Sequence, residues 1–584
     1  MGNRTYMMAA RTEADNSISY ISFGFLLMAI LIIARLFILQ ILQHDYYATM
    51  ALSSHEIYKK IHPTRGEIYF QDTRSRQEYP AAVSRQYYLV FVSPREIAEA
   101  DMASTSKALA EILQFDATVK KTLQEKILAG SKERSAYYPV AKKVNEATAE
   151  QIKNKKIKGV YMVAQEHRYY PENNLGANIL GFLGQDKDGN PLGNYGAEGY
   201  WDKILAGKSG FLLGERGALG NWISLAGRTS VQAVDGADLF LTIDRTLEYR
   251  ACDLLRKGFE DYGAKSAALV MMNPKTGAIL AMCSFPDFDP NNYSQVDSLN
   301  AYNNTSIFTP YEPGSVFKPI TMAAALDLGL LEPNTTFVDP CTRKIDNYTI
   351  HNALNKCYGE QTMTGVLENS INTGMIWVEE KIGRERFGGY VKRFGFGEKT
   401  GIDLDTEAAG NISSFDQKSK IHAATASFGQ GLTVTPLQLA AAYGALANGG
   451  QLYKPYVVAE VRYPNGQVIK TQPQVVSAVI SPRAAKLITG MLVSVVEKGH
   501  GRAAKVADYY LAGKTGTAQI PGPGGYSEET NHTFAGFAPA DDPQFVLIVK
   551  YEAPKRAWAE STAAPVFRNL MDFAFDYYGL PNER

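Results

Sequence analysis

Three short motifs contain side chains that together could catalyse acyl transfer through a serine. They are Ser315-Val316-Phe317-Lys318, Ser370-Ile371-Asn372 and Lys514-Thr515-Gly516-Thr517. A serine hydroxyl is a weak nucleophile and needs a base within hydrogen-bonding distance. Residues at i and i+3 lie on one face of a helix, and Ser315 and Lys318 have this spacing. The sequence therefore predicts Ser315 as the nucleophile and Lys318 as its base.

A lysine acts as a base only when its amine is neutral. Burial and a neighbouring positive charge both lower the pKa of a lysine, and Lys514 is the candidate for that neighbour. Ser315 follows Pro313-Gly314 and precedes an apolar stretch, so we expect it at the start of a helix. The partial positive charge of a helix N-terminus would favour an oxyanion that develops beside Ser315.

The second motif is expected to move protons and to hold the substrate. Ser370 would relay a proton toward a leaving amine. Asn372 would bind the peptide amide of the substrate and orient Lys318. These roles need a hydroxyl and a carboxamide close to the lysine, which the order and the types of these residues allow.

The third motif is expected to bind a terminal carboxylate. Lys514 and the hydroxyls of Thr515 and Thr517 would make charge-assisted hydrogen bonds with it. Gly516 would let the backbone approach closely, since it has no Cβ. The backbone N–H groups of Ser315 and Thr517 would form an oxyanion hole.

Other copies of these motifs occur in the chain, and their context separates them from the catalytic set. Lys514 follows the apolar run Tyr509-Tyr510-Leu511, which predicts a strand that carries the motif. The other Lys-Thr-Gly strings lie in predicted turns, and Ser104 lies inside a polar predicted helix of the first region. These copies are Ser104 with Lys107, Ser298-Leu299-Asn300, Lys275-Thr276-Gly277 and Lys399-Thr400-Gly401.

One N-terminal segment is apolar enough to cross a bilayer. Residues 18–34 contain no charge, Arg35 interrupts the run, and residues 36–42 resume it. At ~1.5 Å per residue such a helix exceeds the ~30 Å hydrocarbon core. No small-residue cleavage pattern follows, so we expect a retained single-pass anchor over residues 18–42 after a cytoplasmic tail of residues 1–17.

The rest of the chain is expected to fold as two regions. A mixed α+β region spans residues 43–235 and a second region spans residues 236–584. In the second region strands precede and follow predicted helices at Ser315–Leu328, Thr364–Ile382, Pro436–Asn448 and Pro482–Glu497. This order favours an antiparallel sheet covered by helices over strict βαβ alternation, a fold class of α+β/α/β type.

The charged and sulfur-containing residues limit the function classes. The chain has 60 basic and 60 acidic residues, which argues against a nucleic-acid partner. The eight histidines show no metal-binding motif, and the spacing of the four cysteines matches no metal site, so neither metal nor cofactor is expected. Cys341 and Cys357 could close a disulfide in an oxidising compartment or remain unpaired small apolar residues.

The three motifs together are the set found in penicillin-binding proteins and serine β-lactamases. The string Tyr311-Glu312-Pro313-Gly314-Ser315-Val316-Phe317-Lys318-Pro319 resembles the active-site segment of class B penicillin-binding proteins. Arg65-Gly66-Glu67-Ile68-Tyr69, Arg168-Tyr169-Tyr170-Pro171 and Gly196-Ala197-Glu198-Gly199 resemble the non-catalytic pedestal of that family. The resemblance covers nearly the whole chain after residue 42.

The resemblance implies a peptidoglycan D,D-transpeptidase in the cytoplasmic membrane with its catalytic domain outside the cytoplasm. Its substrates would be stem peptides that end in D-Ala-D-Ala, β-lactams would acylate Ser315, and a SEDS-type glycan polymerase would be its partner. Three other functions share these sequence features. They are a D,D-carboxypeptidase, a β-lactamase or β-lactam sensor, and a scaffold that activates a polymerase while catalysis is secondary.

Overall fold

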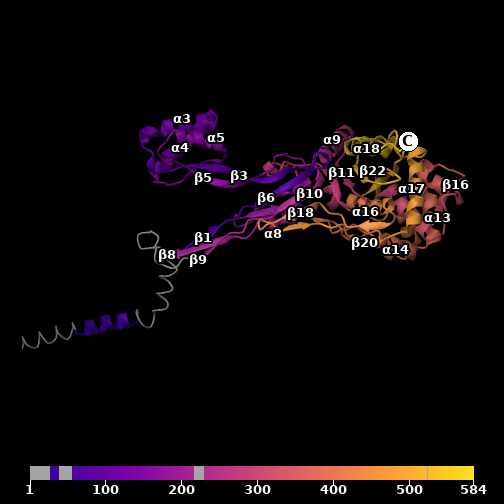
Figure 1. Ribbon diagram of the computed structural model, residues 1–584, viewed down its shortest axis with the longest axis horizontal. Helices are drawn as coiled ribbons and strands as arrows, with labels where there is room; N and C mark the ends of the chain where they lie inside the picture. The colour runs from indigo at the N-terminus through magenta and orange to yellow at the C-terminus, as the bar shows by residue number, and fades with distance from the viewer. Residues whose placement is uncertain (1–25, 39–55, 216–228, 523, 584) are drawn as a thin grey trace, which may run out of the picture. The chain divides into compact units, whose positions relative to one another are not determined.

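The computed structural model describes residues 26–38, 56–215, 229–522 and 524–583 (Figure 1). The chain divides into two compact units. The first unit comprises residues 1–63 and 208–234, and the second comprises residues 64–207 and 235–584.

The first unit contains a three-stranded antiparallel sheet in the order β1-β8-β9. Its strands are β1 (Glu56–Ile61), β8 (Gly210–Glu215) and β9 (Thr229–Val231). Residues 26–37 are α-helical, and the remainder of the expected anchor and the expected tail of residues 1–17 lie outside the described residues. Within the described ranges, none of the helices combines the length and the apolar character that crossing a bilayer requires.

The part of the second unit that contains the three motifs is built around a five-stranded antiparallel sheet in the order β12-β11-β23-β22-β21 (Figure 1). Both faces of this sheet are buried. In the middle of β23, Val546 and Ile548 belong to one apolar core, and the alternating Leu547 and Val549 belong to another. A sheet covered on both faces produces continuous apolar strands, as here. The strands are β11 (Ser266–Met272), β12 (Ile279–Phe285), β21 (Ala512–Gly522), β22 (Gly525–Ala538) and β23 (Phe545–Glu552).

Helices cover the two faces of this sheet. The long helices α9 (Arg245–Tyr262) and α18 (Ala563–Tyr578) pack on one face, and α16 (Pro436–Ala447) packs on the other. The helices near the catalytic motifs are α11 (Lys318–Asp327), α12 (Met363–Glu368), α13 (Asn372–Ile382) and α17 (Pro482–Glu497). The expectation of an antiparallel sheet covered by helices is therefore confirmed.

A second, mixed sheet joins segments from both predicted regions. Its strand order is β19-β18-β10-β2-β3-β4, and β5 also pairs with β3. The strand β10 pairs in parallel with β2 and antiparallel with β18, so strands from before and after residue 235 share one sheet. The bounds are β2 (Ile68–Asp72), β3 (Gln77–Val92), β4 (Tyr138–Val144), β5 (Val160–Tyr169), β10 (Asp238–Asp244), β18 (Val458–Arg462) and β19 (Val468–Lys470).

The C-terminal part of β3 forms a small layer with β4 and β5, and three helices cover this layer. Its separate core includes Val90, Leu109, Ile127 and Ile152. The helices are α3 (Met102–Ile112), α4 (Ala117–Lys132) and α5 (Glu146–Asn154).

The remaining elements are short. The helices are α6 (Ala177–Leu180), α7 (Gly196–Tyr200), α8 (Asp202–Leu205), α10 (Thr305–Phe308), α14 (Arg384–Arg393) and α15 (Lys420–Ala426). The strands are β6 (Phe182–Gln185), β7 (Pro191–Asn194), β13 (Thr336–Val338), β14 (Thr342–Ile345), β15 (Tyr348–His351), β16 (Glu360–Thr362), β17 (Gln451–Tyr453) and β20 (Val475–Ala478).

Candidate active site

Ser315 lies in a tight turn at the entrance of α11. Residues Gly314–Phe317 form a 3-10 turn, and α11 begins at Lys318, whose backbone N–H donates to the carbonyl of Ser315. Helix α11 therefore begins three residues after Ser315, where the predicted helix begins. Residues three apart eclipse each other in a 3-10 turn, so Ser315 and Lys318 keep the shared face that their spacing predicts.

The side chain of Lys318 is fully buried and lies against the second motif. Its Nζ is 2.8 Å from Oδ1 of Asn372, 3.1 Å from Oγ of Ser370 and 2.5 Å from the Ser370 carbonyl oxygen. Burial, and then the charge of Lys514, hold the pKa of Lys318 well below its ordinary value. Nζ is placed to donate to all three oxygens, and in the neutral form, which this lowering favours, it keeps two N–H groups to donate and gains a lone pair that can accept.

Ser370 lies in a break between two helices. The sequence predicts one helix over Thr364–Ile382, and this is wrong, because α12 ends at Glu368 and α13 begins at Asn372. Ser370 has a φ of 56°, in the left-handed region that non-glycine residues rarely adopt. The break turns both the hydroxyl and the carbonyl of Ser370 toward Lys318, which a continuous helix would not do.

A loop residue, Asn352, supplies the cap that begins α13. The N-cap residue Ile371 has no side-chain oxygen, but Oδ1 of Asn352 accepts from the backbone N–H groups of Asn372 (3.0 Å) and Thr373 (3.1 Å). The amide of Asn352 donates to Asp339, 2.9 Å away, and Asp339 also accepts from the hydroxyl of Thr373. Sequence reasoning missed Asn352 and Asp339, because they act from a loop distant in sequence.

The same loop contains one of two disulfides. Cys341 is joined to Cys357, the pair that the sequence left open. The disulfide closes a loop that includes Asn352, and the backbone N–H of Cys341 at the base of this loop donates to the carboxylate of Asp339, 3.0 Å away, which lies two residues before it. The second disulfide, Cys252–Cys283, was not anticipated.

The third motif lies on β21, as expected, although the strand begins at Ala512 and excludes the predicted Tyr509–Leu511. Lys514 is fully buried, and its Nζ donates to the carbonyl of Thr515, 3.1 Å away. Burial lowers the pKa of Lys514 to about 8. The hydroxyl of Thr517 accepts from the N–H of Ala559, 3.2 Å away.

Gly516 sets the distance between β21 and the turn that contains Ser315. A Cβ at this position would lie 3.0 Å from the carbonyl oxygen of Pro313 and 3.0 Å from Cγ1 of Val316. The missing side chain therefore lets the strand pack directly against the turn. This close packing brings the backbone of Thr517 toward the backbone of Ser315, as an oxyanion hole built from both would require.

The alternative copies of the motifs lie in different surroundings. Ser104 is exposed on α3 and donates to the carbonyl of Asp101, and Lys107 pairs with Glu111. Lys275 lies in the turn between β11 and β12 and pairs with Asp542. His532, close to the third motif, is buried between two threonine hydroxyls, and burial lowers its pKa to about 4. It is therefore neutral at physiological pH.

Family models and known proteins match the chain over most of its length. Residues 267–572 match the penicillin binding protein transpeptidase domain, and residues 60–241 match the penicillin-binding protein dimerisation domain. Stage V sporulation protein D of Bacillus subtilis is 35% identical over 93% of this chain and 82% of its own length. Peptidoglycan D,D-transpeptidase FtsI of Escherichia coli is 31% identical over 85% of this chain and 81% of its own.

A solved structure supports the same relationship. Penicillin binding protein 3 of Mycobacterium tuberculosis, complexed with aztreonam, superposes with a TM-score of 0.68 at 26% identity, over 90% of this chain and 98% of the other. The chain belongs to the penicillin-binding protein family, with a dimerisation region followed by a transpeptidase domain.

Proposed function

We propose that this peptidoglycan D,D-transpeptidase cross-links stem peptides through an acyl-enzyme on Ser315. Oγ of Ser315 attacks the penultimate D-Ala carbonyl while Lys318 accepts its proton. The terminal D-Ala leaves, and an amine of a neighbouring stem peptide takes the acyl group. The observation that carries this proposal is the buried, low-pKa Lys318, hydrogen-bonded to both polar residues of the second motif.

The remaining roles follow from the same geometry. Ser370 shares a proton with Lys318 and passes it to the leaving D-Ala amine, because its hydroxyl is 3.1 Å from the lysine nitrogen. Lys514 and the hydroxyls of Thr515 and Thr517 bind the terminal carboxylate. The N–H groups of Ser315 and Thr517 stabilise the oxyanion, at roughly 3 kcal/mol for each donor.

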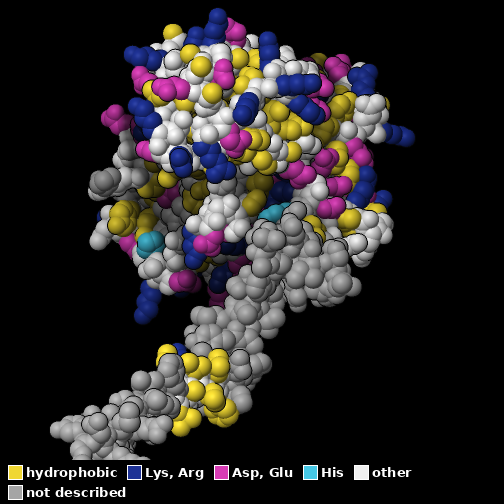
Figure 2. All heavy atoms as spheres, turned by 90° about the vertical axis from the view of Figure 1, so that its left-hand side faces the viewer, with side chains coloured by type: hydrophobic (Ala, Val, Ile, Leu, Met, Phe, Trp, Pro, Cys, Tyr) yellow, Lys and Arg dark blue, Asp and Glu magenta, His cyan; other side chains and the backbone are white. Residues whose placement is uncertain are grey.

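We also propose the organisation of the chain around this domain. Residues 1–17 are a cytoplasmic tail, residues 18–42 a single-pass anchor, residues 43–235 a pedestal, and residues 236–584 the transpeptidase domain outside the cytoplasm. The exposed, mostly apolar side chains of residues 26–38 (Figure 2) support the anchor. A SEDS-type glycan polymerase is the partner implied by the family resemblance.

Labelling with a fluorescent penicillin tests the proposed nucleophile. Full-length protein in detergent should gain one covalent adduct by intact mass, and Ser315→Ala should gain none. Ser104→Ala is the matched control, since Ser104 has the same motif spacing on the exposed helix α3. A folded Ser315→Ala protein that still forms the adduct would refute the proposal.

Product analysis separates cross-linking from hydrolysis. Stem pentapeptide with an added acceptor amine should give cross-linked dimer and free D-Ala. Tetrapeptide without dimer would identify a D,D-carboxypeptidase instead. Growth that depends on the protein but persists in a Ser315→Ala strain would favour the scaffold function.

A further inference from the structure

Glu312, three residues before Ser315, joins three segments beside the active site. Its side chain is only 7% exposed. Oε1 accepts from the backbone N–H of Gly431, 3.0 Å away, and Oε2 accepts from the hydroxyl of Tyr526, 2.9 Å away. Gly431 lies in the loop between α15 and α16, and Tyr526 lies on β22. One carboxyl group therefore holds the turn of Ser315 to this loop and to the hairpin of β21 and β22.

The hydroxyl of Tyr526 is the donor in its contact with Glu312. Burial, and then the charge of Glu312, raise the pKa of Tyr526, so the phenol keeps its hydrogen. A hydrogen bond to a carboxylate is stronger than one between two neutral groups. Tyr526 is 47% exposed, so its hydroxyl can be removed with little effect on the apolar core.

The contact lies on a short path between the two N–H groups that are expected to form the oxyanion hole. Tyr526 pairs across the hairpin with Pro521, which follows Thr517 by four residues on β21. The neighbouring Ser527 also ties this part of the hairpin together, because its hydroxyl donates to a backbone carbonyl of β21, 3.0 Å away. Loss of the contact would therefore let Thr517 move relative to Ser315.

The positions of the two residues, and not the charge of Glu312, connect them to the catalytic lysines. Burial, and then the charge of Lys514, lower the pKa of Lys318. Burial lowers the pKa of Lys514, and the charge of Glu560 opposes this effect. Neither shift involves Glu312, so its carboxyl group would influence acylation by holding the turn in place.

We propose that Glu312 and Tyr526 are positioning residues for acylation, which together hold the turn of Ser315 at the distance from β21 that the oxyanion hole requires. This role rests on the proposed function, in which Ser315 is the nucleophile. It acts through the backbone, because the N–H groups of Ser315 and Thr517 must both reach the same oxygen. Loss of the contact would weaken binding of the transition state more than binding of the penicillin itself.

Tyr526→Phe tests the contact by removing a single hydroxyl group. In full-length protein in detergent, the first-order rate constant for acylation by a bound penicillin should fall about tenfold. The dissociation constant of the initial complex should stay the same, because the contact matters in the transition state. A normal first-order rate constant, with or without a lower melting temperature, would overturn the proposal.

Tyr161→Phe is the matched control for this change. Tyr161 is 44% exposed and its hydroxyl donates to Glu96, so the variant loses a tyrosine–glutamate contact of the same kind. This contact lies beside the small layer of β3, β4 and β5, outside the transpeptidase domain. Tyr161→Phe should therefore be acylated at the normal rate.

A double-mutant cycle tests whether Glu312 and Tyr526 act as a pair. Glu312→Gln should lower the same rate constant, and adding Tyr526→Phe should lower it no further. Losses that multiply in the double variant would mean that the residues act separately, which would overturn the proposal. The single variant Tyr526→Phe still decides the matter if Glu312→Gln fails to fold.

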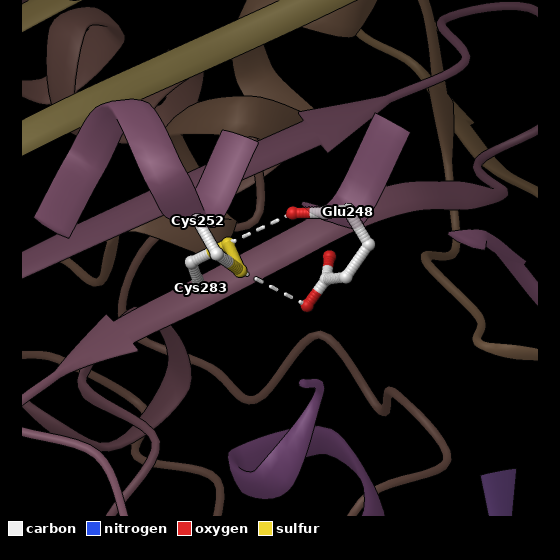
Figure 3. Close-up of side chains that lie close together, drawn as sticks. All are labelled: Glu248, Cys252 and Cys283. Atoms are coloured by element: carbon white, nitrogen blue, oxygen red, sulfur yellow. Dashed lines mark hydrogen bonds between the residues drawn. A yellow bond between two sulfur atoms is a disulfide. The ribbon is translucent and has the colours of Figure 1, made fainter. Parts of the chain in front are cut away.

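Glu248→Gln is the control for changing a buried carboxyl group to an amide. Glu248 is fully buried on α9 and lies against the disulfide that joins Cys252 to Cys283 (Figure 3). Cys283 belongs to β12, the edge strand at the opposite side of the sheet from β21, so acylation of Glu248→Gln should be normal.

The same measurements separate failure of this role from failure of the proposed function. An unmodified protein that forms no penicillin adduct would overturn the assignment of Ser315 and the positioning role with it. An unmodified protein that is acylated no faster than Tyr526→Phe and Glu312→Gln would overturn the positioning role alone.

Discussion

The proposed mechanism requires opposite charge states of two fully buried lysines. In it, Lys318 is neutral when it accepts the proton of Ser315, and burial together with Lys514 depresses the pKa of Lys318. In the same mechanism Lys514 is charged when it binds a carboxylate, and burial lowers its pKa to about 8. The arrangement suits this division of roles, because the charge on Lys514 favours the neutral form of Lys318.

The pH dependence of acylation should report Lys514. The side chain of Lys514 carries a positive charge below about pH 8 and loses it at higher pH. The second-order rate constant for acylation by a penicillin should therefore fall above about pH 8. Stopped-flow acylation between pH 6 and 10 measures this. In Lys514→Arg the fall should disappear, because arginine stays charged throughout this range. If acylation of the unmodified protein kept a constant rate up to pH 10, that result would contradict the carboxylate-binding role proposed for Lys514.

At the scale of elements, the start of α13 depends on Asn352. Asn352→Ala removes the oxygen that caps two N–H groups, which should lower the free energy of unfolding by about 1–2 kcal/mol. Asn372 would then be less well held against Lys318, and acylation should slow about tenfold or more. Asn347→Ala, an exposed change in the same loop, is the control and should alter neither quantity. Normal acylation by Asn352→Ala would show that the cap is only structural.

The turn before Ser315 should be sensitive to one methyl group. Gly314 has a φ of 59°, and a Cβ there would lie 2.7 Å from Cβ of Ala518 on β21. Gly314→Ala should therefore slow penicillin acylation as well as lower stability. Gly329→Ala shares the positive φ of 66° but meets open space, so it should lose only ~1 kcal/mol of stability with normal acylation. Equal effects of the two changes would mean that backbone strain, not contact with β21, dominates.

The sequence predicted which helices and strands exist better than it predicted the residues at which they begin and end. Apolar runs identified β11 and β23, and the three motifs identified the residues that meet around Lys318. The break at Ser370 escaped prediction because a left-handed serine is stabilised by contacts distant in sequence, among them Asn352. The Cys252–Cys283 pair was missed for a similar reason, since it depends on how α9 packs on β12.

At the scale of the second unit, the pedestal and the catalytic region are joined through the mixed sheet. The strands β2 and β3 lie in one sheet with β10 and β18. Glu198, fully buried on α7, accepts from Arg65 just before β2 (2.6 Å) and from Arg168 near the end of β5 (2.6 Å). The sheet and this ion-pair network therefore predict that the two regions unfold together.

Glu198→Gln tests that coupling. Removing one partner of a buried ion pair leaves two buried arginines poorly compensated, which should cost about 3–5 kcal/mol. Glu78→Gln is the control, because the exposed pair of Glu78 with Arg462 should contribute at most ~1 kcal/mol. Urea unfolding followed by tryptophan fluorescence and by penicillin labelling should give one midpoint, lowered in both signals for Glu198→Gln. A labelling midpoint that stays unchanged while fluorescence shifts would instead mean that the catalytic region folds independently of the pedestal.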